Sequence, residues 1–319
     1  MKLAFLFPGQ GSQAVGMGRA LADEFPAAGE VFEAADRSLG ARLSAICWDG
    51  PEEELKKTVN AQPALLTHSV AALRLLEAAG VAPAWCAGHS LGEYSACVAA
   101  GSLGFEDAVQ LVRLRGDLMY RAGLERPGAM AAILGLGAED VRAVCEEAAQ
   151  GGVVTGANFN APGQVVISGE VEPVERACAL ALSRGAKRAI RLEVSGAFHS
   201  PLMASAAQGL GEGLARVTFR DARCPIIANV SASPVQGAGE IRGSLEAQLL
   251  GAVRWQESIE LLLEQGAEGF IEIGTGRVLR GLLRSIDRRA PSWNVDDPES
   301  LRATLSALGA GSARATEKV

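Results

Sequence analysis

The sequence has few aromatic side chains, only three histidines and no surplus of positive charge. Its formal net charge of −7 argues against a general nucleic-acid-binding protein, because such proteins need a basic face that replaces the counterions of phosphate groups. Any acidic partner would therefore have to bind at a local basic patch.

Long apolar runs and closely spaced cysteine pairs are also missing. The first apolar run, residues 3–7, ends at Pro8 and Gly9, so it is too short for a signal-peptide core, and no other run approaches the length of a membrane-spanning helix. The six cysteines are scattered, without a C-x-x-C pair that would suggest a zinc site or a redox dithiol. We therefore expect reduced, buried thiols in a cytoplasmic protein.

Apolar residues make up 48% of the chain and charged residues 21%, and glycine and alanine are abundant, which is typical of a close-packed α/β protein. Four apolar segments have the character of buried parallel strands, each followed by a turn and a helical stretch: residues 2–7, 84–89, 224–230 and 269–274. This alternation predicts a parallel sheet covered by helices.

The order of strand and helix patterns changes between about residues 124 and 195. Strand patterns at 128–136, 152–159, 163–169 and 187–194 combine with helical patterns at 138–149 and 172–185 in the order β-α-β-β-α-β. That order is typical of a ferredoxin-like unit. We expect a small ferredoxin-like α+β subdomain, residues 124–195, inserted in a large α/β-hydrolase-like domain of residues 1–123 and 196–319, with a site in the cleft between them.

A nucleophile is suggested by Gly88-His89-Ser90-Leu91-Gly92, the only G-x-S-x-G in the chain. It lies between an apolar strand and a helix, where a sharp turn would project the serine oxygen at the helix N-terminus. The alternative is that Ser90 only caps that helix. The strand before and the helix after favour the nucleophile.

A serine nucleophile needs a base, and histidine is the usual one near neutral pH. His89 adjoins Ser90 and should point away at a sharp turn, and His68 lies on a helical pattern typical of a structural residue. His199 follows the last strand of the inserted unit, where the chain returns to the cleft, so we interpret it as the base; a surface or helix-terminal role is the alternative. No acid completes a triad, since Glu193 alternates with core residues, and a backbone carbonyl can orient the imidazole instead.

Arg115 interrupts the apolar stripe of a helix over residues 105–123. A buried guanidinium needs a carboxylate partner, because removing its charge from water costs several kcal/mol. A structural salt bridge is the commoner explanation, but Arg115 follows the serine turn by one helix and could bind a substrate carboxylate with its planar fork. In that case the acyl group would carry a free acid.

The opening loop, Gly9-x-Gly11-x-x-Ala14, is close to a dinucleotide-binding fingerprint. An oxidoreductase would then need an acidic residue about twenty positions on, after a second strand. Glu30, Glu33 and Asp36 have that distance but lie on a helical pattern with no strand before them. A serine hydrolase is the other alternative, although it has no evident use for a buried arginine at the acyl site.

Seven motifs, in order, resemble those of malonyl-CoA:acyl carrier protein transacylases and of the acyltransferase domains of fatty acid and polyketide synthases, over residues 3–284. They are FPGQGSQ, GHSLGEYSA, LVRLRG, NFNAPGQVVISG, GAFHSPLM, QLLGAVRW and GTGRVL. The resemblance implies transfer of malonyl from coenzyme A to Ser90, and from there to the phosphopantetheine thiol of acyl carrier protein. No metal or redox cofactor is implied, and the route is expected to supply extender units for fatty acid synthesis.

The resemblance also implies roles for individual residues. His199 is the base, oriented by the backbone carbonyl of Gln248, and Arg115 pairs with the malonyl carboxylate. The N–H groups of Gln10 and Leu91 form the oxyanion hole. Three further positions line the pocket: Gln62, Asn160 in the turn of the small subdomain, and Phe198, where a large ring favours malonyl over methylmalonyl. Gly196 replaces a larger residue of many relatives, which weakens the expectation of strict selectivity.

Acyl carrier proteins are acidic, so the partner is expected to dock on basic side chains. Candidates come from two segments of the sequence, residues 187–191 and 284–289: Lys187, Arg188, Arg191, Arg284, Arg288 and Arg289. Ordinary solvated charge is the alternative explanation for all six.

Overall fold

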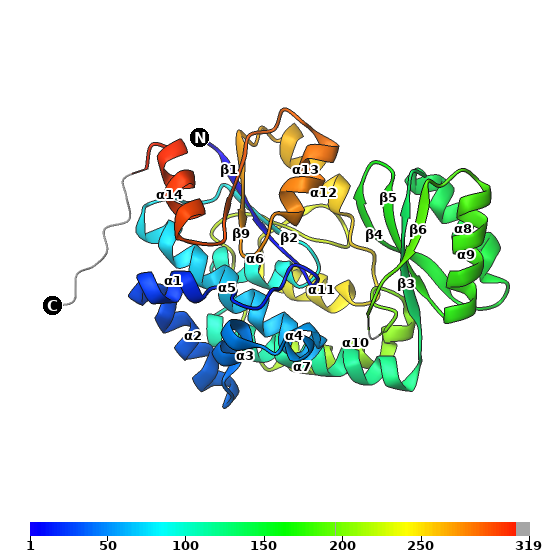
Figure 1. Cartoon of the computed structure of the whole chain (residues 1–319), viewed down its shortest axis with the longest axis horizontal. Helices are drawn as coiled ribbons and strands as arrows, with labels where there is room; N and C mark the ends of the chain where they lie inside the picture. Colours follow the sequence, from blue (N-terminus) through cyan, green and yellow to red (C-terminus); the bar gives the residue numbers. More distant parts are fainter. Residues whose placement is uncertain (195, 311–319) are drawn as a thin grey trace.

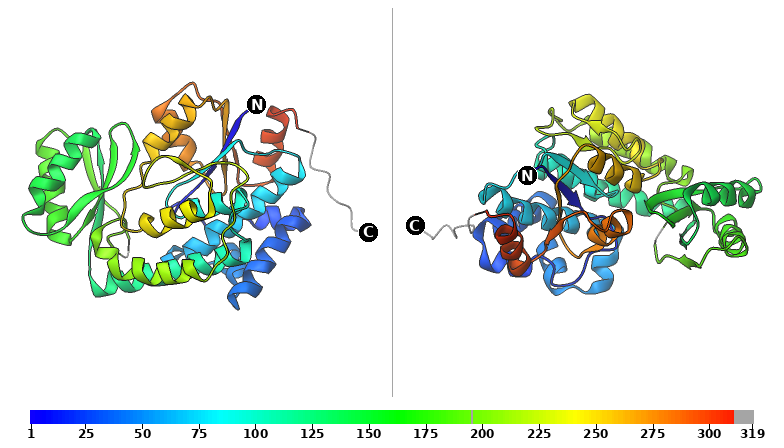
Figure 2. Two further views of the ribbon diagram at one scale, coloured as in Figure 1. Left: turned by 180° about the vertical axis from the view of Figure 1, so that it is seen from behind. Right: turned by 90° about the horizontal axis from the view of Figure 1, so that it is seen from above.

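The computed structural model describes residues 1–194 and 196–310. Its strands form two separate sheets, one of six strands and one of four. The smaller sheet and its two helices project from one end of the larger body, as the green part of Figure 1 and the view from behind in Figure 2 make clear.

The larger sheet has the strand order β10-β9-β1-β2-β7-β8. Its first five strands are parallel to their neighbours, and β8 is antiparallel to β7. The parallel sheet predicted from the apolar segments is therefore confirmed, while β8 and β10 are additional strands. The bounds are β1 Leu3–Phe7, β2 Trp85–Gly88, β7 Ile226–Ile227, β8 Pro234–Val235, β9 Gly269–Ile273 and β10 Ser292–Val295.

Helices cover both faces of this sheet, which explains why β1 and β9 are apolar at every position or nearly so. Leu3, Phe5 and Phe7 of β1 pack into one core, and Ala4 and Leu6 pack into another on the opposite face. The helices are α1 Arg19–Glu24, α2 Pro26–Leu39, α3 Leu43–Asp49, α4 Glu52–Lys56, α5 Thr58–Ala78, α6 Gly92–Ala99, α7 Phe105–Glu125, α10 Ala204–Ala215, α11 Ala238–Gln248, α12 Trp255–Glu264, α13 Val278–Ile286 and α14 Pro298–Ala307, with a short 3₁₀ helix at Pro201–Met203. None of the described helices is both long enough and apolar enough to cross a membrane.

The smaller sheet is antiparallel, with the strand order β4-β5-β3-β6 and helices α8 and α9 against it. This is the ferredoxin-like arrangement that the β-α-β-β-α-β order predicts. The elements are β3 Ala129–Leu134, α8 Ala138–Ala149, β4 Val154–Ala161, β5 Gln164–Gly169, α9 Val171–Ser183 and β6 Arg188–Arg191. All lie within residues 124–195, whose limits as a subdomain stay a prediction.

Main-chain hydrogen bonds of strand β4 connect the smaller part to the larger one. Phe159 donates its N–H to the carbonyl of Val253 at 2.9 Å, and Val253 donates to the carbonyl of Ala157 at 2.8 Å. Figure 2, in its view from above, shows the smaller part extending to one side of the larger. The segment paired with β4 also carries Gly251, which lies in the site described next.

Candidate active site

Ser90 lies in the tight turn between β2 and α6, the position predicted for a nucleophile. Its φ of 51° is in the left-handed region, which is a strained conformation for a residue other than glycine. Glycines make the turn possible, because a Cβ on Gly92 would lie 2.0 Å from the carbonyl oxygen of Phe7. The turn therefore holds the Ser90 side chain directly before the N-terminus of α6.

His199 contacts this serine, with its Nε2 2.8 Å from the Ser90 Oγ. On the other side of the ring, Nδ1 lies 3.0 Å from the carbonyl oxygen of Gln248 and 3.1 Å from that of Gly251. Because both partners are acceptors, Nδ1 must carry the proton and Nε2 is free to accept one from Ser90. Gly251, which sequence reasoning missed, shares the orienting role predicted for the carbonyl of Gln248.

His199 is only 4% exposed, and burial is the main reason that its pKa falls from 6.5 to about 3. The positive charge of Arg115 lowers this pKa further. The imidazole is therefore neutral at physiological pH, which is the form that a general base requires. Glu193, the nearest acid in sequence, is exposed at the rim of the cavity.

Arg115 of α7 is 1% exposed and lies against the same serine. Its Nη2 donates to Ser90 Oγ at 3.1 Å and to the side-chain oxygen of Gln248 at 2.9 Å, and its Nη1 donates to that of Gln62 at 2.8 Å. Its Nε has no partner, and no carboxylate in the described part of the chain lies within ion-pair distance of the guanidinium. The structural salt bridge considered from the sequence is therefore wrong.

Two polar residues that the sequence did not single out support this arrangement. Asn229, two residues after the end of β7, accepts the Ser90 N–H at 2.7 Å and donates to the carbonyl of Gly88 at 2.7 Å. Glu93 of α6 accepts from the Gln248 side-chain amide at 2.6 Å and from the Asn229 N–H at 3.3 Å. Burial raises the pKa of Glu93 to about 7.

Leu91 and Gln10, the residues whose backbone N–H groups are expected to form the oxyanion hole, line the same cavity as Ser90. Neither donates a hydrogen bond to any acceptor within residues 1–194 and 196–310. Gly9 allows the two loops to meet, because a Cβ there would lie 2.5 Å from the carbonyl oxygen of His89. Two unpaired donors beside a nucleophile can bind a developing oxyanion.

The cavity has a volume of about 560 Å³ and lies between the two parts of the molecule, lined by residues of both. Phe198 lines it, as the resemblance implies. Gln62 does not; it lies behind Arg115 and holds the guanidinium. Asn160 lies in strand β4, which extends to Ala161, rather than in the turn, and the residue of β4 that lines the cavity is Asn158.

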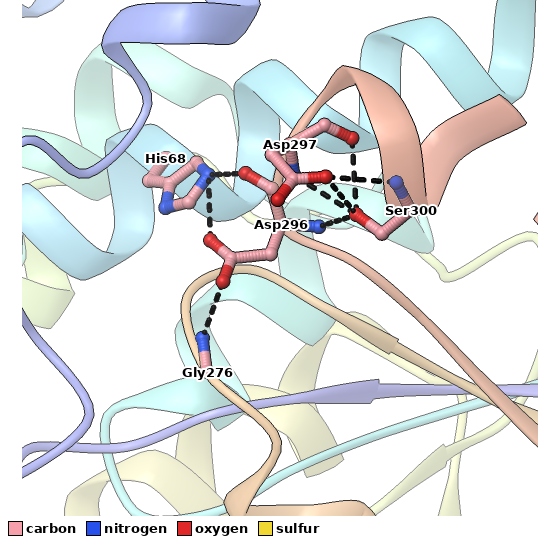
Figure 3. A network of polar contacts seen from close by, with 5 residues as sticks. All are labelled: His68, Gly276, Asp296, Asp297 and Ser300. Atoms are coloured by element: carbon pink, nitrogen blue, oxygen red, sulfur yellow. Dashed lines mark hydrogen bonds and ion pairs between the residues drawn. The ribbon is translucent and has the colours of Figure 1, made fainter. Parts of the chain in front are cut away.

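The other two histidines have partners away from Ser90. His89 Nε2 lies 2.8 Å from the side-chain oxygen of Asn160, so the ring points away from the nucleophile, as predicted. His68 is fully buried in α5, and its Nε2 lies 2.9 Å from the carbonyl oxygen of Asp296. Figure 3 shows that the Asp296 carboxylate links this histidine to the Gly276 N–H, 3.0 Å away. His68 therefore ties α5 to the segments around β9 and β10, which is a structural role.

The opening loop does not continue as a dinucleotide-binding unit. Glu30, Glu33 and Asp36 all lie within helix α2, and no strand is found between β1 and that helix. The ribose-binding acid at the end of a second strand is therefore missing from the described residues. Gly9 of the loop is used for close backbone contact with His89, next to Ser90, and Gly11 has a φ of 103°, which favours glycine.

Comparisons with known proteins agree with this geometry. The acyl transferase domain family matches residues 4–287. The chain is 49% identical to the malonyl CoA-acyl carrier protein transacylase of Bacillus subtilis, covering 96% of this chain and 97% of that one. It is 47% identical to the transacylase of the same name from Escherichia coli, covering 95% and 99%. A malonyl-transacylase solved in complex with a type II polyketide acyl-carrier protein superposes with a TM-score of 0.94 at 46% identity, covering 96% and 100%.

Proposed function

Because this chain belongs to the acyl transferase family, and within it to the malonyl CoA-acyl carrier protein transacylases, we propose that it moves a malonyl group from malonyl-CoA to acyl carrier protein. Malonyl is chosen as the acyl group because of Arg115. Its buried guanidinium lies beside Ser90 and has no carboxylate partner among the described residues. The carboxylate of malonyl-CoA supplies the missing charge.

In the first half-reaction the malonyl carboxylate binds Arg115, and the thioester carbonyl faces Ser90. His199 Nε2 takes the Ser90 proton as the Oγ–C bond forms, and the N–H groups of Leu91 and Gln10 bind the oxyanion. The C–S bond then breaks, and the proton passes from His199 to the sulfur of coenzyme A. The product is malonyl-Ser90.

The second half-reaction runs the same steps in reverse, with the phosphopantetheine thiol of acyl carrier protein as the nucleophile. His199 takes the thiol proton, the C–S bond forms, and the Ser90 Oγ leaves with the proton. Base catalysis contributes about a hundred- to ten-thousandfold in rate, and each oxyanion donor about a hundred- to a thousandfold. The chain's own groups perform every step, so the proposal includes no metal or redox cofactor.

Selectivity among acyl groups is assigned to Phe198, whose ring lies in the cavity wall. An α-methyl group on the malonyl unit would compete with this ring for space. The neighbouring Gly196 leaves the ring room to move, because a Cβ there would lie 3.3 Å from a ring carbon of Phe198. The proposed preference is therefore for malonyl over methylmalonyl without strict exclusion, and fatty acid synthesis is proposed as the pathway that uses the product.

Docking of the acidic carrier protein is assigned to exposed basic residues outside the cavity. Arg191 is paired with Glu175, and Arg289 lies 3.7 Å from Asp287. The other four candidates make no ion pair within the part of the chain that the structure describes: Lys187, Arg188, Arg284 and Arg288. Charges of this kind raise the association rate more than the affinity. The four unpaired residues are therefore the better candidates.

The proposed function is tested by the intact mass of the protein after brief exposure to malonyl-CoA. The expected result is an added malonyl group that disappears when acyl carrier protein with its phosphopantetheine arm is supplied, and no added mass in Ser90→Ala. Release of free malonate instead of transfer to the carrier would support a hydrolase and overturn the proposal.

A further inference from the structure

Two cysteines far apart in the sequence, Cys86 and Cys224, are in contact on neighbouring segments of the larger sheet. Their sulfur atoms lie 3.7 Å apart. Cys86 belongs to β2, and Cys224 lies two residues before β7, the neighbouring strand. No other pair of thiols in residues 1–194 and 196–310 makes such a contact. Both are free, buried thiols, as the scattered spacing of the cysteines predicts, but the spacing gives no sign of their contact.

The two thiols differ in their access to solvent. Cys224 is 9% exposed and lines a second cavity of about 530 Å³, together with Arg74, Glu77 and Arg223. Cys86 is fully buried and lies behind it. A small reagent that enters this cavity therefore meets Cys224 first.

The two thiols also differ in pKa, and again Cys224 is the more reactive one. The contact with the Cys86 thiol lowers the pKa of Cys224, and the nearby guanidinium of Arg223 lowers it further, so that together they outweigh the effect of burial. Burial raises the pKa of Cys86 well above its ordinary value. Cys224 is therefore the thiol that more readily becomes a nucleophilic thiolate, and Cys86 keeps its proton as a resolving thiol would.

We propose that Cys86 and Cys224 form a redox-active thiol pair that a hydroperoxide oxidises to a disulfide. The Cys224 thiolate attacks one peroxide oxygen, the O–O bond breaks, and a sulfenic acid and one hydroxide, which is protonated to water, result. The Cys86 sulfur then attacks the Cys224 sulfur and displaces hydroxide, which leaves as water with the Cys86 proton. Two thiols lose two electrons, and hydrogen peroxide is reduced to two waters.

The disulfide acts on the two segments that hold the nucleophile. A disulfide S–S bond is about 2.05 Å long, so the two sulfur atoms, now 3.7 Å apart, must approach each other by roughly 1.6 Å. β2 continues from Cys86 into Ser90, and the β7 segment continues from Cys224 into Asn229, which accepts the Ser90 N–H. Oxidation therefore displaces Ser90 relative to His199 and slows its acylation.

The thiol chemistry itself is tested on the whole chain, without any substrate. The protein is treated with hydrogen peroxide, the remaining thiols are alkylated under denaturing conditions, and the peptides are identified by mass spectrometry. The expected products are a linked Cys86–Cys224 peptide and a loss of two free thiols. In Cys86→Ser the disulfide is absent, and dimedone traps a sulfenic acid on Cys224.

Cys178→Ser is the matched control, because Cys178 is a partly exposed thiol of α9 in the other part of the molecule. This variant should form the disulfide as the wild type does. The proposal is overturned if Cys224 stays reduced at peroxide concentrations that oxidise Cys178. It is equally overturned if Cys224 forms a sulfenic acid that Cys86 does not resolve.

The effect on Ser90 rests on the proposed function, so it is measured separately as the rate of malonyl-Ser90 formation. In the wild type we expect this rate to fall on the order of a hundredfold on oxidation, as for a catalytic group misplaced by about 1 Å, and to recover with dithiothreitol. A normal rate in the disulfide form, or an equal loss in oxidised Cys86→Ser, would overturn the coupling. Failure of the proposed function itself would already appear as absent acylation in the reduced protein.

Discussion

Arg115 is the residue at which burial and charge conflict most strongly. Its guanidinium is held by the neutral oxygens of Ser90, Gln62 and Gln248, and none of them compensates a full positive charge. The carboxyl group of Glu93, whose pKa burial raises to about 7, lies in the same network but is separated from Arg115 by the side-chain amide of Gln248. A substrate carboxylate would satisfy the unpaired Nε and the charge together.

Replacing this arginine should therefore change selectivity rather than remove all activity. In Arg115→Ala we expect malonyl transfer to fall on the order of a hundredfold or more, the effect of losing one partner of a buried charge pair, while acetyl transfer is retained or increased. The measurement is kcat/KM for malonyl-CoA and for acetyl-CoA. Arg113→Ala, two positions along the same helix, is the control and should lower neither. Equal losses for both substrates in Arg115→Ala would assign the arginine a structural role.

The base also has an expected signature in the pH profile. Because the pKa of His199 lies at about 3, acylation of Ser90 should not decline as the pH falls through 6.5, the ordinary pKa of histidine. Glu93 titrates at about 7 in the same network, so single-turnover acylation is measured from about pH 5 to 8 in the wild type and in Glu93→Gln. An acid limb centred near 6.5 in both proteins would contradict the assignment.

At the scale of elements, the site depends on how closely β1, β2 and α6 approach one another. Gly92 begins α6 where a side chain would collide with the end of β1, and Gly88 ends β2 where a Cβ would lie 1.9 Å from the carbonyl carbon of Gly92. Any side chain here must push the Ser90 turn away from the loop that carries Gln10.

Gly92→Ala is therefore expected to destabilise the protein by about 1–3 kcal/mol, the cost of overpacking, and to abolish acylation of Ser90. The measurements are urea unfolding and intact mass after exposure to malonyl-CoA. Gly243→Ala in helix α11 is the matched control, since a Cβ there meets nothing within 4 Å, and it should stabilise by about 0.4–1 kcal/mol. Similar stabilities for the two variants would rule out the proposed close packing.

The elements with strong apolar patterns could be predicted from the sequence, and those held by their neighbours could not. The strands at 2–7 and 269–274 are apolar at most positions, and the structure has them within a residue or two of the expected bounds. β10, with the sequence Ser-Trp-Asn-Val, has no such pattern and exists because it pairs with β9 at the edge of the sheet. Of the expected strand at 224–230, only Ile226–Ile227 pairs as β7.

The residues of the site also divide into those with a local signal in the sequence and those without one. Ser90 could be found from its motif, His199 from its place after the inserted unit, and Arg115 because it interrupts an apolar stripe. The fold brings all three into contact. Glu93 has the local character of an ordinary first-turn helix residue, and Asn229 that of a strand end. Their partners lie more than 130 positions away, so no local signal marks them. The same is true of the contact between Cys86 and Cys224.

Over the whole molecule, buried ionisable groups couple stability to pH in two opposite directions. Burial raises the pKa of Glu93 and of Glu272 to about 7 and lowers that of the three histidines. Glu272 takes no part in the proposed reaction, so its effect on stability can be measured separately from activity. It lies in β9 and accepts the N–H groups of Leu279 and Arg280 at the start of α13, at 3.0 and 2.9 Å.

The contribution of Glu272 follows from proton counting. Between pH 4.5, its ordinary pKa, and about 7, the native state holds a proton that the unfolded state has released. The free energy of unfolding due to this group therefore falls as the pH rises through that window, and it is constant above. The total change is on the order of 3 kcal/mol, from about 1.4 kcal/mol per pKa unit.

Glu272→Gln isolates this contribution, because the amide cannot ionise. The variant loses an acceptor for one helix N–H, which gives an offset that does not depend on pH. On top of that offset, the wild type should lose stability relative to the variant on the order of 3 kcal/mol between about pH 4.5 and 8, measured by urea unfolding. Glu264→Gln, an exposed position in α12, should give a difference that does not change with pH. A pH-independent difference for Glu272→Gln as well would mean that the carboxyl under α13 is already ionised at pH 4.5, and that its two N–H donors outweigh the cost of burial.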